Sequence, residues 1–235
     1  MGKNIGVIIP AAGKGKRMGT TLSKQFHNLD GKPIIVHTIE CFQSMKEIDF
    51  IIVAVDSTKI EYLNSLVNNY RLLKVKKIVE GGKERQDSVW NCLKVLKQFD
   101  VDNVIIHDAV RPFISHSLIK SVLNEVTKHS ATVVAVRAKD TIKYSSDNEY
   151  IEETPKRDNL WIAQTPQAFD YKLIFRAYQK AYKDTFIGTD DVSLVERLGK
   201  KIRIVEGSFD NIKITTAEDF ELAKLIIKRF VFNCM

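Results

Sequence analysis

The first segment whose residue types suit phosphate chemistry runs from residue 10 to residue 19 and reads PAAGKGKRMG. Gly13 and Gly15 let the backbone approach a ligand closely and turn its N–H groups toward phosphate oxygens. The positive charges here are Lys14, Lys16, Arg17 and, further along, Lys24. The segment matches neither the dinucleotide fingerprint nor the Walker phosphate loop. It predicts a phosphate site of another kind, and the alternative is a flexible surface loop with solvated lysines.

A second glycine segment, GGKERQDS, covers residues 81–88. Paired glycines after a strand allow close backbone contact with a flat base, and Ser88 can donate or accept a hydrogen bond near a helix start. The alternative is a turn followed by a helix N-cap, with Asp87 or Ser88 as the capping residue.

The third segment, HDAVRPF, covers residues 107–113. An aspartate at the tip of a buried strand, as predicted for Asp108, suits a hydrated Mg²⁺ beside a triphosphate. Arg111 either presents its planar guanidinium to a phosphate or pairs with Asp108 as a structural ion pair. His107 is assigned to packing, because no nearby nucleophile needs a base.

Further polar residues are scattered along the second half of the chain. They are Thr141, Arg157, Thr165, the Thr-Asp-Asp run at residues 189–191 and the Asp-Asn-Ile-Lys run that ends at Lys213. Each of them alone is typical of a turn, a cap or a solvated lysine. Neither a Ser/His/Asp arrangement nor a His/Cys cluster with metal-ligand spacing is evident.

The elements that must position these residues alternate between short apolar runs and amphipathic ones. Runs rich in β-branched residues predict buried strands: residues 5–9, Phe50–Val55, 75–79, 104–107 and 132–136. Apolar residues at three- and four-residue steps predict helices between them: residues 34–45, 58–70, 89–99, His116–His129, Tyr171–Lys183 and 216–230. For the last helix, Thr216 with Asp219 three positions on predicts an N-cap.

This alternation predicts an α/β fold, with a mostly parallel sheet covered by helices on both faces. Ligands of such sheets bind at the carboxyl ends of the strands, so the loops after residues 9, 79 and 107 are the expected site. Residues 139–165 interrupt the pattern with polar residues and a turn at residues 145–148, and they predict a β-hairpin arm outside the sheet. We expect one domain over residues 1–235.

The composition excludes several classes. The 235 residues are 44% hydrophobic and 28% charged, with a net charge of +7. The basic residues are scattered, which disfavours nucleic-acid binding and equally suits a site for a triphosphate and a second phosphate. Three cysteines without paired spacing favour a reducing compartment, with Cys41 and Cys92 in the core. A signal peptide or membrane span is not evident, so we expect a cytoplasmic location without membrane association.

Taken together, the segments resemble the methylerythritol-phosphate cytidylyltransferases of non-mevalonate isoprenoid synthesis. The matching pieces occur in the family's order from residue 5 to about residue 229. They are PAAGKGKRM, SKQF, GGKERQDSV, HDAVRPF, KDTIK, QTPQAF, GTDDVSLVE and DNIKIT. The resemblance implies a Rossmann-like nucleotidyltransferase fold, a homodimer clasped by exchanged arms, and transfer of CMP from CTP to 2-C-methyl-D-erythritol 4-phosphate with release of pyrophosphate.

The resemblance also implies roles for individual residues. Arg17 and Lys24 would bind the triphosphate and stabilise charge at the α-phosphorus, with Lys213 near the α-phosphate. The nucleotide would be surrounded by Ala11, Ala12, Gly13, Gly82 and Ser88, with Asp108 at the ribose and the Mg²⁺ ion. The sugar-phosphate side would be formed by Arg111, Thr141, Thr165, Thr189 and Arg157, the last supplied by the partner chain.

Two positions depart from the family pattern. Ser23 stands where the family often has proline, and Lys83 stands where an acidic or small residue is common. The nearest alternative is a ribitol-5-phosphate cytidylyltransferase, which shares HDAVRPF and TPQ but usually begins the first loop with Leu-Ala-Gly-Gly. The Pro-Ala-Ala-Gly of residues 10–13 favours methylerythritol phosphate as the substrate. A non-catalytic basic protein that binds nucleic acid would leave the two glycine segments unexplained.

Overall fold

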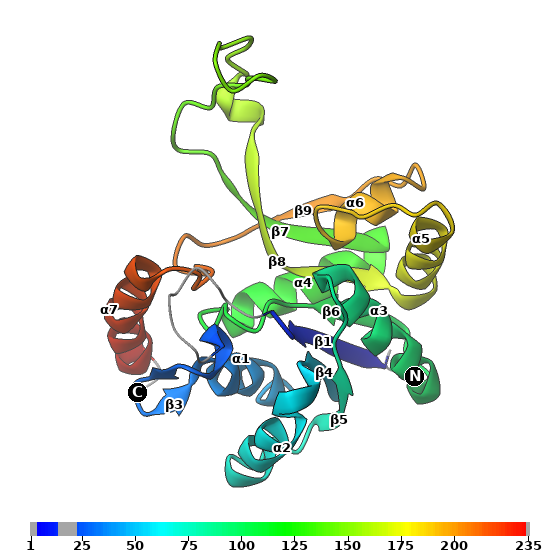
Figure 1. Cartoon of the computed structure of the whole chain (residues 1–235), viewed down its shortest axis with the longest axis vertical. Helices are drawn as coiled ribbons and strands as arrows, with labels where there is room; N and C mark the ends of the chain where they lie inside the picture. The colour runs from blue at the N-terminus through cyan, green and yellow to red at the C-terminus, as the bar shows by residue number, and fades with distance from the viewer. Residues whose placement is uncertain (1–3, 14–22, 234–235) are drawn as a thin grey trace.

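A computed structural model describes residues 4–13 and 23–233 and shows a seven-stranded sheet with helices on both faces (Figure 1). The strand order is β5-β4-β1-β6-β8-β7-β9. The bounds are β1 Ile5–Ala11, β4 Phe50–Val55, β5 Val75–Glu80, β6 Asn103–Ile106, β7 Ala131–Arg137, β8 Trp161–Asp170 and β9 Arg203–Glu206. Within this sheet, as far as the structure describes the chain, β8 runs antiparallel to its neighbours β6 and β7, and the other pairs are parallel. The predicted α/β class and mostly parallel sheet are therefore confirmed.

Seven α-helices cover or flank the sheet in the part of the chain that the structure describes. They are α1 Ile34–Gln43, α2 Ile60–Asn69, α3 Arg85–Leu96, α4 His116–His129, α5 Tyr171–Lys183, α6 Asp191–Glu196 and α7 Ala217–Asn233. Helices α1, α2 and α4 pack on one face, and α3, α5 and α6 pack on the other. The predicted N-cap of α7 is confirmed, because the Asp219 N–H donates to Oγ1 of Thr216 at 3.2 Å.

The buried strands supply both apolar layers because successive side chains point to opposite faces of a sheet. In β1, Val7 and Ile9 lie in the layer with α1, α2 and α4, whereas Ile8 lies in the layer with α3, α5 and α6. A third, smaller cluster joins α7 to the loop after β6 and includes Val110, Phe113 and Ile226. Both faces of the central strands are thus covered, and the loops at their carboxyl ends are left to form a site.

The arm is shorter than the sequence predicts. Residues 161–165 belong to β8 in the main sheet, where Trp161 pairs with Arg137. The hydropathy pattern did not indicate strand β8, because its residues Gln164 and Gln167 are polar although they are buried. Their amides are hydrogen-bonded, to the Ser208 carbonyl at 2.9 Å and to the Asp190 carboxylate at 2.8 Å, respectively, which removes the cost of burying them. Strand β9 was not predicted either.

Residues 138–160 project from the sheet between β7 and β8 (Figure 1). The two sides of this arm meet at one isolated antiparallel bridge, between Tyr144 and Glu153, rather than in a regular hairpin. Large apolar side chains of the arm are exposed, including Tyr150 at 72% and Ile151 at 64%. In the described residues, no helix is long and apolar enough to cross a membrane.

Candidate active site

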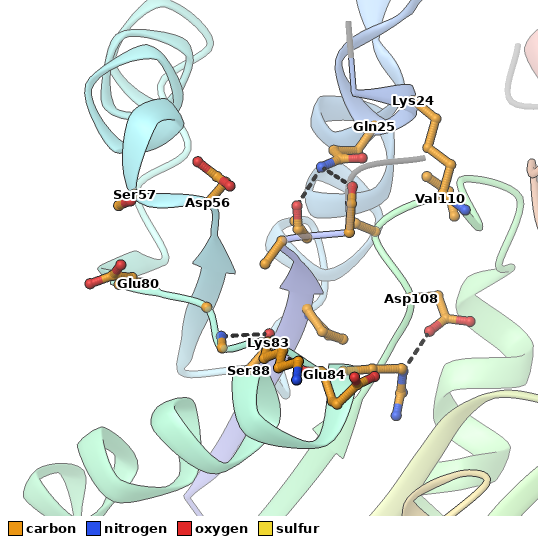
Figure 2. A pocket seen from close by; sticks show the side chains of 18 of the residues that line it. Lys24, Gln25, Asp56, Ser57, Glu80, Lys83, Glu84, Ser88, Asp108 and Val110 are labelled. Atoms are coloured by element: carbon orange, nitrogen blue, oxygen red, sulfur yellow. Dashed lines mark hydrogen bonds and ion pairs between the residues drawn. The ribbon is translucent and has the colours of Figure 1, made fainter. Parts of the chain in front are cut away.

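The carboxyl ends of β1, β4, β5 and β6 surround a cavity of about 530 Å³, which we name the first cavity (Figure 2). All three predicted loops line it. The described lining residues that bear charge are Lys24, Lys83, Arg85 and Lys213 on the positive side and Asp56, Glu80, Glu84 and Asp108 on the negative side. Asp56 lies in the loop after β4, which the sequence did not single out.

Gln25, which is only 3% exposed, anchors the described start of the first loop. Its Nε2 donates to the carbonyl oxygens of Ala11 and, at 3.3 Å, of Gly13 (Figure 2). A Cβ built on Gly13 would meet no atom of the described residues within 4 Å. Lys24, one residue before Gln25, lines the same cavity. Arg17 and its basic neighbours Lys14 and Lys16 lie outside the described residues.

The second loop packs directly against the first. A Cβ built on Gly81 would lie 2.2 Å from the Cβ of Ala12, and one built on Gly82 would lie 2.1 Å from the Cβ of Asp87. Both positions therefore require glycine for lack of space. The Gly82 N–H donates to Oγ of Ser88 at 3.1 Å, and that hydroxyl lies 3.2 Å from the Glu84 carbonyl and donates to it. Ser88 thus fixes the shape of the loop.

The capping residue of α3 is neither of the two that the alternative interpretation of this segment named. Glu84, rather than Asp87 or Ser88, is the N-cap, and Asp87 completes a reciprocal capping box at the third helical position. Because the Ser88 hydroxyl is engaged by Gly82 and Glu84, it is not available as a cap. The Glu84 N–H instead donates to the Asp87 carboxylate at 2.9 Å.

Asp108 lies at the start of the loop after β6, where three cations share its carboxylate. Its Oδ1 lies 3.2 Å from Nε of Arg85. Its Oδ2 lies 3.4 Å from Nε of Arg111 and 2.9 Å from Nζ of Lys213. The predicted Asp108–Arg111 ion pair is therefore present, within a larger cluster that Arg85 and Lys213 complete.

Burial and charge act in opposite directions on this cluster. Burial alone would raise the pKa of Asp108, but the positive charges of Arg85, Lys213 and Arg111 outweigh it and hold that pKa well below its ordinary value. Burial is also the main cause that lowers the pKa of Arg111, against the effect of Asp108. Asp108 is therefore ionised at neutral pH and serves as the fixed negative centre of the site.

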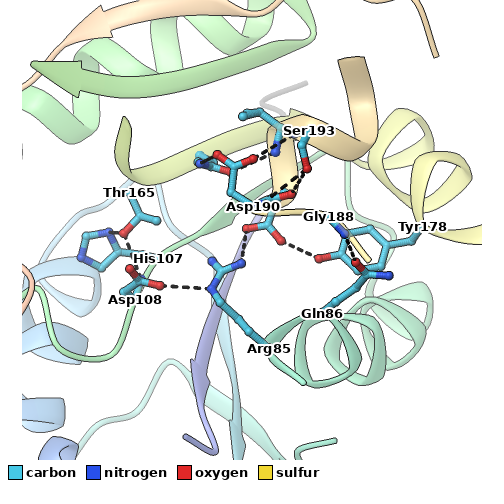
Figure 3. Close-up of polar contacts among 12 residues, drawn as sticks. Arg85, Gln86, His107, Asp108, Thr165, Tyr178, Gly188, Asp190 and Ser193 are labelled. Atoms are coloured by element: carbon cyan, nitrogen blue, oxygen red, sulfur yellow. Dashed lines mark hydrogen bonds and ion pairs between the residues drawn. The ribbon is translucent and has the colours of Figure 1, made fainter. Parts of the chain in front are cut away.

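His107 and Thr165 hold the backbone of Asp108 in place (Figure 3). Nε2 of His107 donates to the Arg111 carbonyl at 2.9 Å, and Nδ1 accepts from the Thr165 hydroxyl at 3.2 Å. The same hydroxyl accepts from the Asp108 N–H at 3.0 Å. Burial lowers the pKa of His107 to about 4, so the ring is neutral. The assignment of His107 to packing is confirmed.

A second cavity of about 330 Å³ adjoins the first. Three residues line both: Arg85, Asp108 and Lys213. The second cavity is otherwise lined by Arg111, Ala163, Gln164, Thr165, Gln167, Thr189 and Asp190. Three residues predicted for the sugar-phosphate side, Arg111, Thr165 and Thr189, therefore meet around one space.

Thr141 and Arg157 are not brought to either cavity of their own chain. Both are exposed residues of the arm, and Nη1 of Arg157 donates to the Lys139 carbonyl at 3.0 Å, within the arm.

Several site residues stand inside motifs that were recognised for other residues. Arg85 and Gln86 stand inside the second glycine segment, and Asp191 ends the Thr-Asp-Asp run. Asn211 is fully buried and its amide donates to the carbonyl of Thr165 at 2.9 Å, which docks the segment that carries Lys213 against β8. A charged or amide residue inside a recognised motif could have indicated a further site residue. Its role could not be predicted, because the residues that it contacts lie far away in the sequence.

The donor set for a metal ion is sparse. Among the residues that the structure describes, none form a group of three or more His, Cys, Asp or Glu side chains that could hold a metal. Of the carboxylates that the structure describes, Asp108 alone lines both cavities. One carboxylate suits Mg²⁺, which commonly takes one or two carboxylates and completes its shell with substrate phosphates and water.

Comparison with known proteins gives a consistent result over nearly the whole chain. Residues 5–229 match the family model of IspD, 2-C-methyl-D-erythritol 4-phosphate cytidylyltransferase. The protein of that name from Alkaliphilus oremlandii is 47% identical over 223 residues, 94% of each chain. Its namesake from Lysinibacillus sphaericus is 45% identical over 95% of each chain. The crystal structure of 4-diphosphocytidyl-2C-methyl-D-erythritol synthase from Anaerococcus prevotii superposes with a TM-score of 0.85 at 34% identity, covering 97% of this chain and 100% of the other.

Proposed function

Since this chain belongs to the 2-C-methyl-D-erythritol 4-phosphate cytidylyltransferase family, we propose that its two adjoining cavities hold the two substrates of that reaction. The enzyme transfers CMP from CTP to 2-C-methyl-D-erythritol 4-phosphate and releases pyrophosphate. The observation that carries the assignment of the cavities is their shared boundary, formed by Arg85, Asp108 and Lys213. Two phosphate-bearing substrates that react with each other need such a junction.

We assign the first cavity to CTP. The tight packing of Ala12 on Gly81 makes a surface of backbone and small side chains that suits a flat base, with Gly82 and Ser88 beside it. The open backbone at Gly13 and the ammonium group of Lys24 lie on the side expected for the triphosphate. Arg17 is assigned to the triphosphate from the family resemblance alone.

We assign the second cavity to the sugar phosphate. Arg111 and Lys213 bring positive charge to it, and Thr165 and Thr189 bring hydroxyl groups. The Thr165 hydroxyl is already engaged by His107 and Asp108, so its main contribution is to hold Asp108. Thr141 and Arg157 are assigned to this side as well, with Arg157 supplied by the arm of a partner chain.

The reaction requires positioning and charge neutralisation rather than a covalent nucleophile. A phosphate oxygen of the sugar phosphate attacks the α-phosphorus of CTP, the new P–O bond forms, and the bond to the β-phosphate breaks as pyrophosphate leaves. Two anions must approach each other, so fixed cations lower the barrier. Lys24, Lys213 and Arg17 fill this role in our assignment.

We propose Asp108 as the protein ligand of a Mg²⁺ ion whose remaining ligands are phosphate oxygens and water. When bound, the ion would neutralise charge on the triphosphate. Its binding would compete with the three cations that now contact the Asp108 carboxylate. We further propose a homodimer joined by the arms and a cytosolic location, consistent with cysteines that lack paired spacing.

The substrate assignment is tested with CTP and two acceptors in separate reactions, 2-C-methyl-D-erythritol 4-phosphate and ribitol 5-phosphate, by measuring the pyrophosphate released. We expect turnover with methylerythritol phosphate and little with ribitol phosphate. The reverse preference would contradict the proposal. Retention on DNA that fades with salt, without turnover of either acceptor, would favour the nucleic-acid-binding alternative.

A further inference from the structure

Arg85 is the first residue of α3, where Figure 3 shows it, and it lines both cavities. Its guanidinium group lies between two carboxylates that come from opposite sides of the site. Nε is 3.2 Å from Oδ1 of Asp108, and Nη1 is 2.8 Å from Oδ2 of Asp191. Burial would lower the pKa of Arg85, but the two carboxylates outweigh burial and raise it. Arg85 is thus a permanently charged bridge.

The partner on the far side, Asp191, is 1% exposed and begins α6. Its other carboxylate oxygen accepts a hydrogen bond from the Tyr178 hydroxyl. A buried carboxylate of this kind needs a cation, because an unpaired buried charge is strongly destabilising. Arg85 is the cation that the structure provides for it.

The residue after Arg85 makes a second connection to the same segment. Gln86 accepts from the Gly188 N–H at 2.9 Å through Oε1 and donates to the Phe186 carbonyl at 3.0 Å through Nε2. The segment from Phe186 to Asp191 is therefore tied to the start of α3 at three points. Thr189, which lines the second cavity, lies inside this segment.

We propose that Arg85 is a positioning residue for the sugar phosphate: it holds Asp191, and with it the segment that carries Thr189, in register with Asp108, Arg111 and Lys213. Nε and Nη1 of its guanidinium group already bind protein carboxylates, and Arg85 acts through them. This inference rests on the proposed assignment of the second cavity to the sugar phosphate. It gives α3, which follows the nucleotide loop, a second role in shaping the acceptor site.

The test compares Arg85→Ala, Arg85→Lys and the double variant Arg85→Ala/Asp191→Asn in steady-state kinetics with both substrates varied. The double variant removes the unpaired buried charge, so it folds even where Arg85→Ala does not. Lysine is a point charge and cannot bridge two carboxylates as the planar guanidinium does. Arg203→Ala is the matched control, because Arg203 pairs with Glu125 on the surface, with 57% of its side chain exposed.

We expect the KM for methylerythritol phosphate to rise about tenfold in the double variant, as when a charged hydrogen bond is lost. The KM for CTP should rise less, because Arg111 and Lys213 still contact Asp108. The KM of Arg85→Lys for methylerythritol phosphate should lie between those of the wild type and the double variant. An unchanged KM for both substrates in the double variant would overturn the proposal, since Arg85 would then only neutralise Asp191. A rise in the KM for CTP alone, or an equal rise for both, would overturn it too. The wild-type turnover tests the proposed function separately.

Discussion

At the scale of single residues, the centre of the site is one carboxylate with three cationic neighbours. Asp108 contacts Arg85, Arg111 and Lys213 at distances of 2.9 to 3.4 Å. Such a cluster keeps the cations close to one another before any substrate arrives, which their mutual repulsion would otherwise oppose. An incoming phosphate then meets positive groups that are already oriented, which is the basis of electrostatic stabilisation in a preorganised site.

Lys24, which also lines the first cavity, is the clearest test of a catalytic charge. We expect Lys24→Ala to lower kcat by about 10²–10³, by comparison with the removal of one oxyanion donor, with an unchanged circular-dichroism spectrum and melting temperature. Lys120→Ala is the control, since Lys120 is 60% exposed on α4. Turnover by Lys24→Ala at a rate close to wild type would show that the catalytic charge lies elsewhere.

His107 makes stability depend on pH in a defined direction. Its pKa falls from 6.5 to about 4 on folding because the ring is buried. Between these values the unfolded chain binds a proton that the native chain does not, so His107's contribution is complete above pH 6.5 and is lost as the pH falls toward 4. The loss would total about 3 kcal/mol.

We expect His107→Asn to have a flatter dependence of stability on pH than the wild type over this window, although it is less stable at pH 7. Urea denaturation midpoints at several pH values measure both slopes. Other titrating groups, such as His37, contribute to both proteins and cancel in the difference. Equal slopes would mean that His107 does not carry the effect.

At the scale of elements, the site depends on how two loops fit against each other. The loops after β1 and β5 meet where Ala12 faces Gly81, and there is room for only one methyl group between them. The same region begins α3, whose capping box of Glu84 and Asp87 fixes the direction in which the helix leaves the loop. Packing and capping together hold the proposed base-binding surface rigid.

Exchanging the methyl group tests this fit. We expect Gly81→Ala to lower the melting temperature and to raise the KM for CTP, because its Cβ would clash with Ala12 at 2.2 Å. Adding Ala12→Gly should recover a large part of both losses, since the double variant again has one methyl group between the loops. Gly13→Ala is the stability control, as a Cβ there meets none of the described residues within 4 Å.

If Gly81→Ala left stability and the KM for CTP unchanged, the two loops would have room to separate, and the proposed rigid surface would be wrong. If the double variant were no better than Gly81→Ala, the clash would involve Ser88, whose Oγ is 3.0 Å from the same Cβ.

At the scale of the whole molecule, the sheet and its two apolar layers form a body from which the arm of residues 138–160 projects (Figure 1). The exposed Tyr144, Tyr150 and Ile151 of the arm are costly to leave in water as a group. A second chain that covers them would remove this cost and would carry Arg157 toward a neighbouring site. This arrangement supports the proposed dimer.

Complementation between two inactive chains tests the exchange of arms. We expect Lys24→Ala and Arg157→Ala chains to be inactive or weak alone, because each lacks one part of every site. After they are unfolded together and refolded as a mixture, mixed dimers should regain activity, since one site then has both Lys24 and the partner's Arg157. A mixture as inactive as its components would show that Arg157 acts within its own chain. Analytical ultracentrifugation supplies the oligomeric state independently.

The sequence by itself determined the five strands with β-branched apolar runs, the helices between them, and the three loops that line the first cavity. These features depend on local periodicity, which a chain carries whatever its partners are. Strand β8 was decided only by the tertiary structure, because its buried Gln164 and Gln167 become acceptable once Ser208 and Asp190 satisfy them.

The same holds for the site. Asp108 could be recognised from its place after a strand, but the bridge from Arg85 to Asp191 joins residues more than a hundred positions apart. Ion pairs and hydrogen bonds between distant segments produce no periodic pattern in the sequence. Each partner, taken alone, cannot be distinguished from an ordinary polar surface residue. Only the folded chain shows which of them are buried together and must therefore be matched in charge.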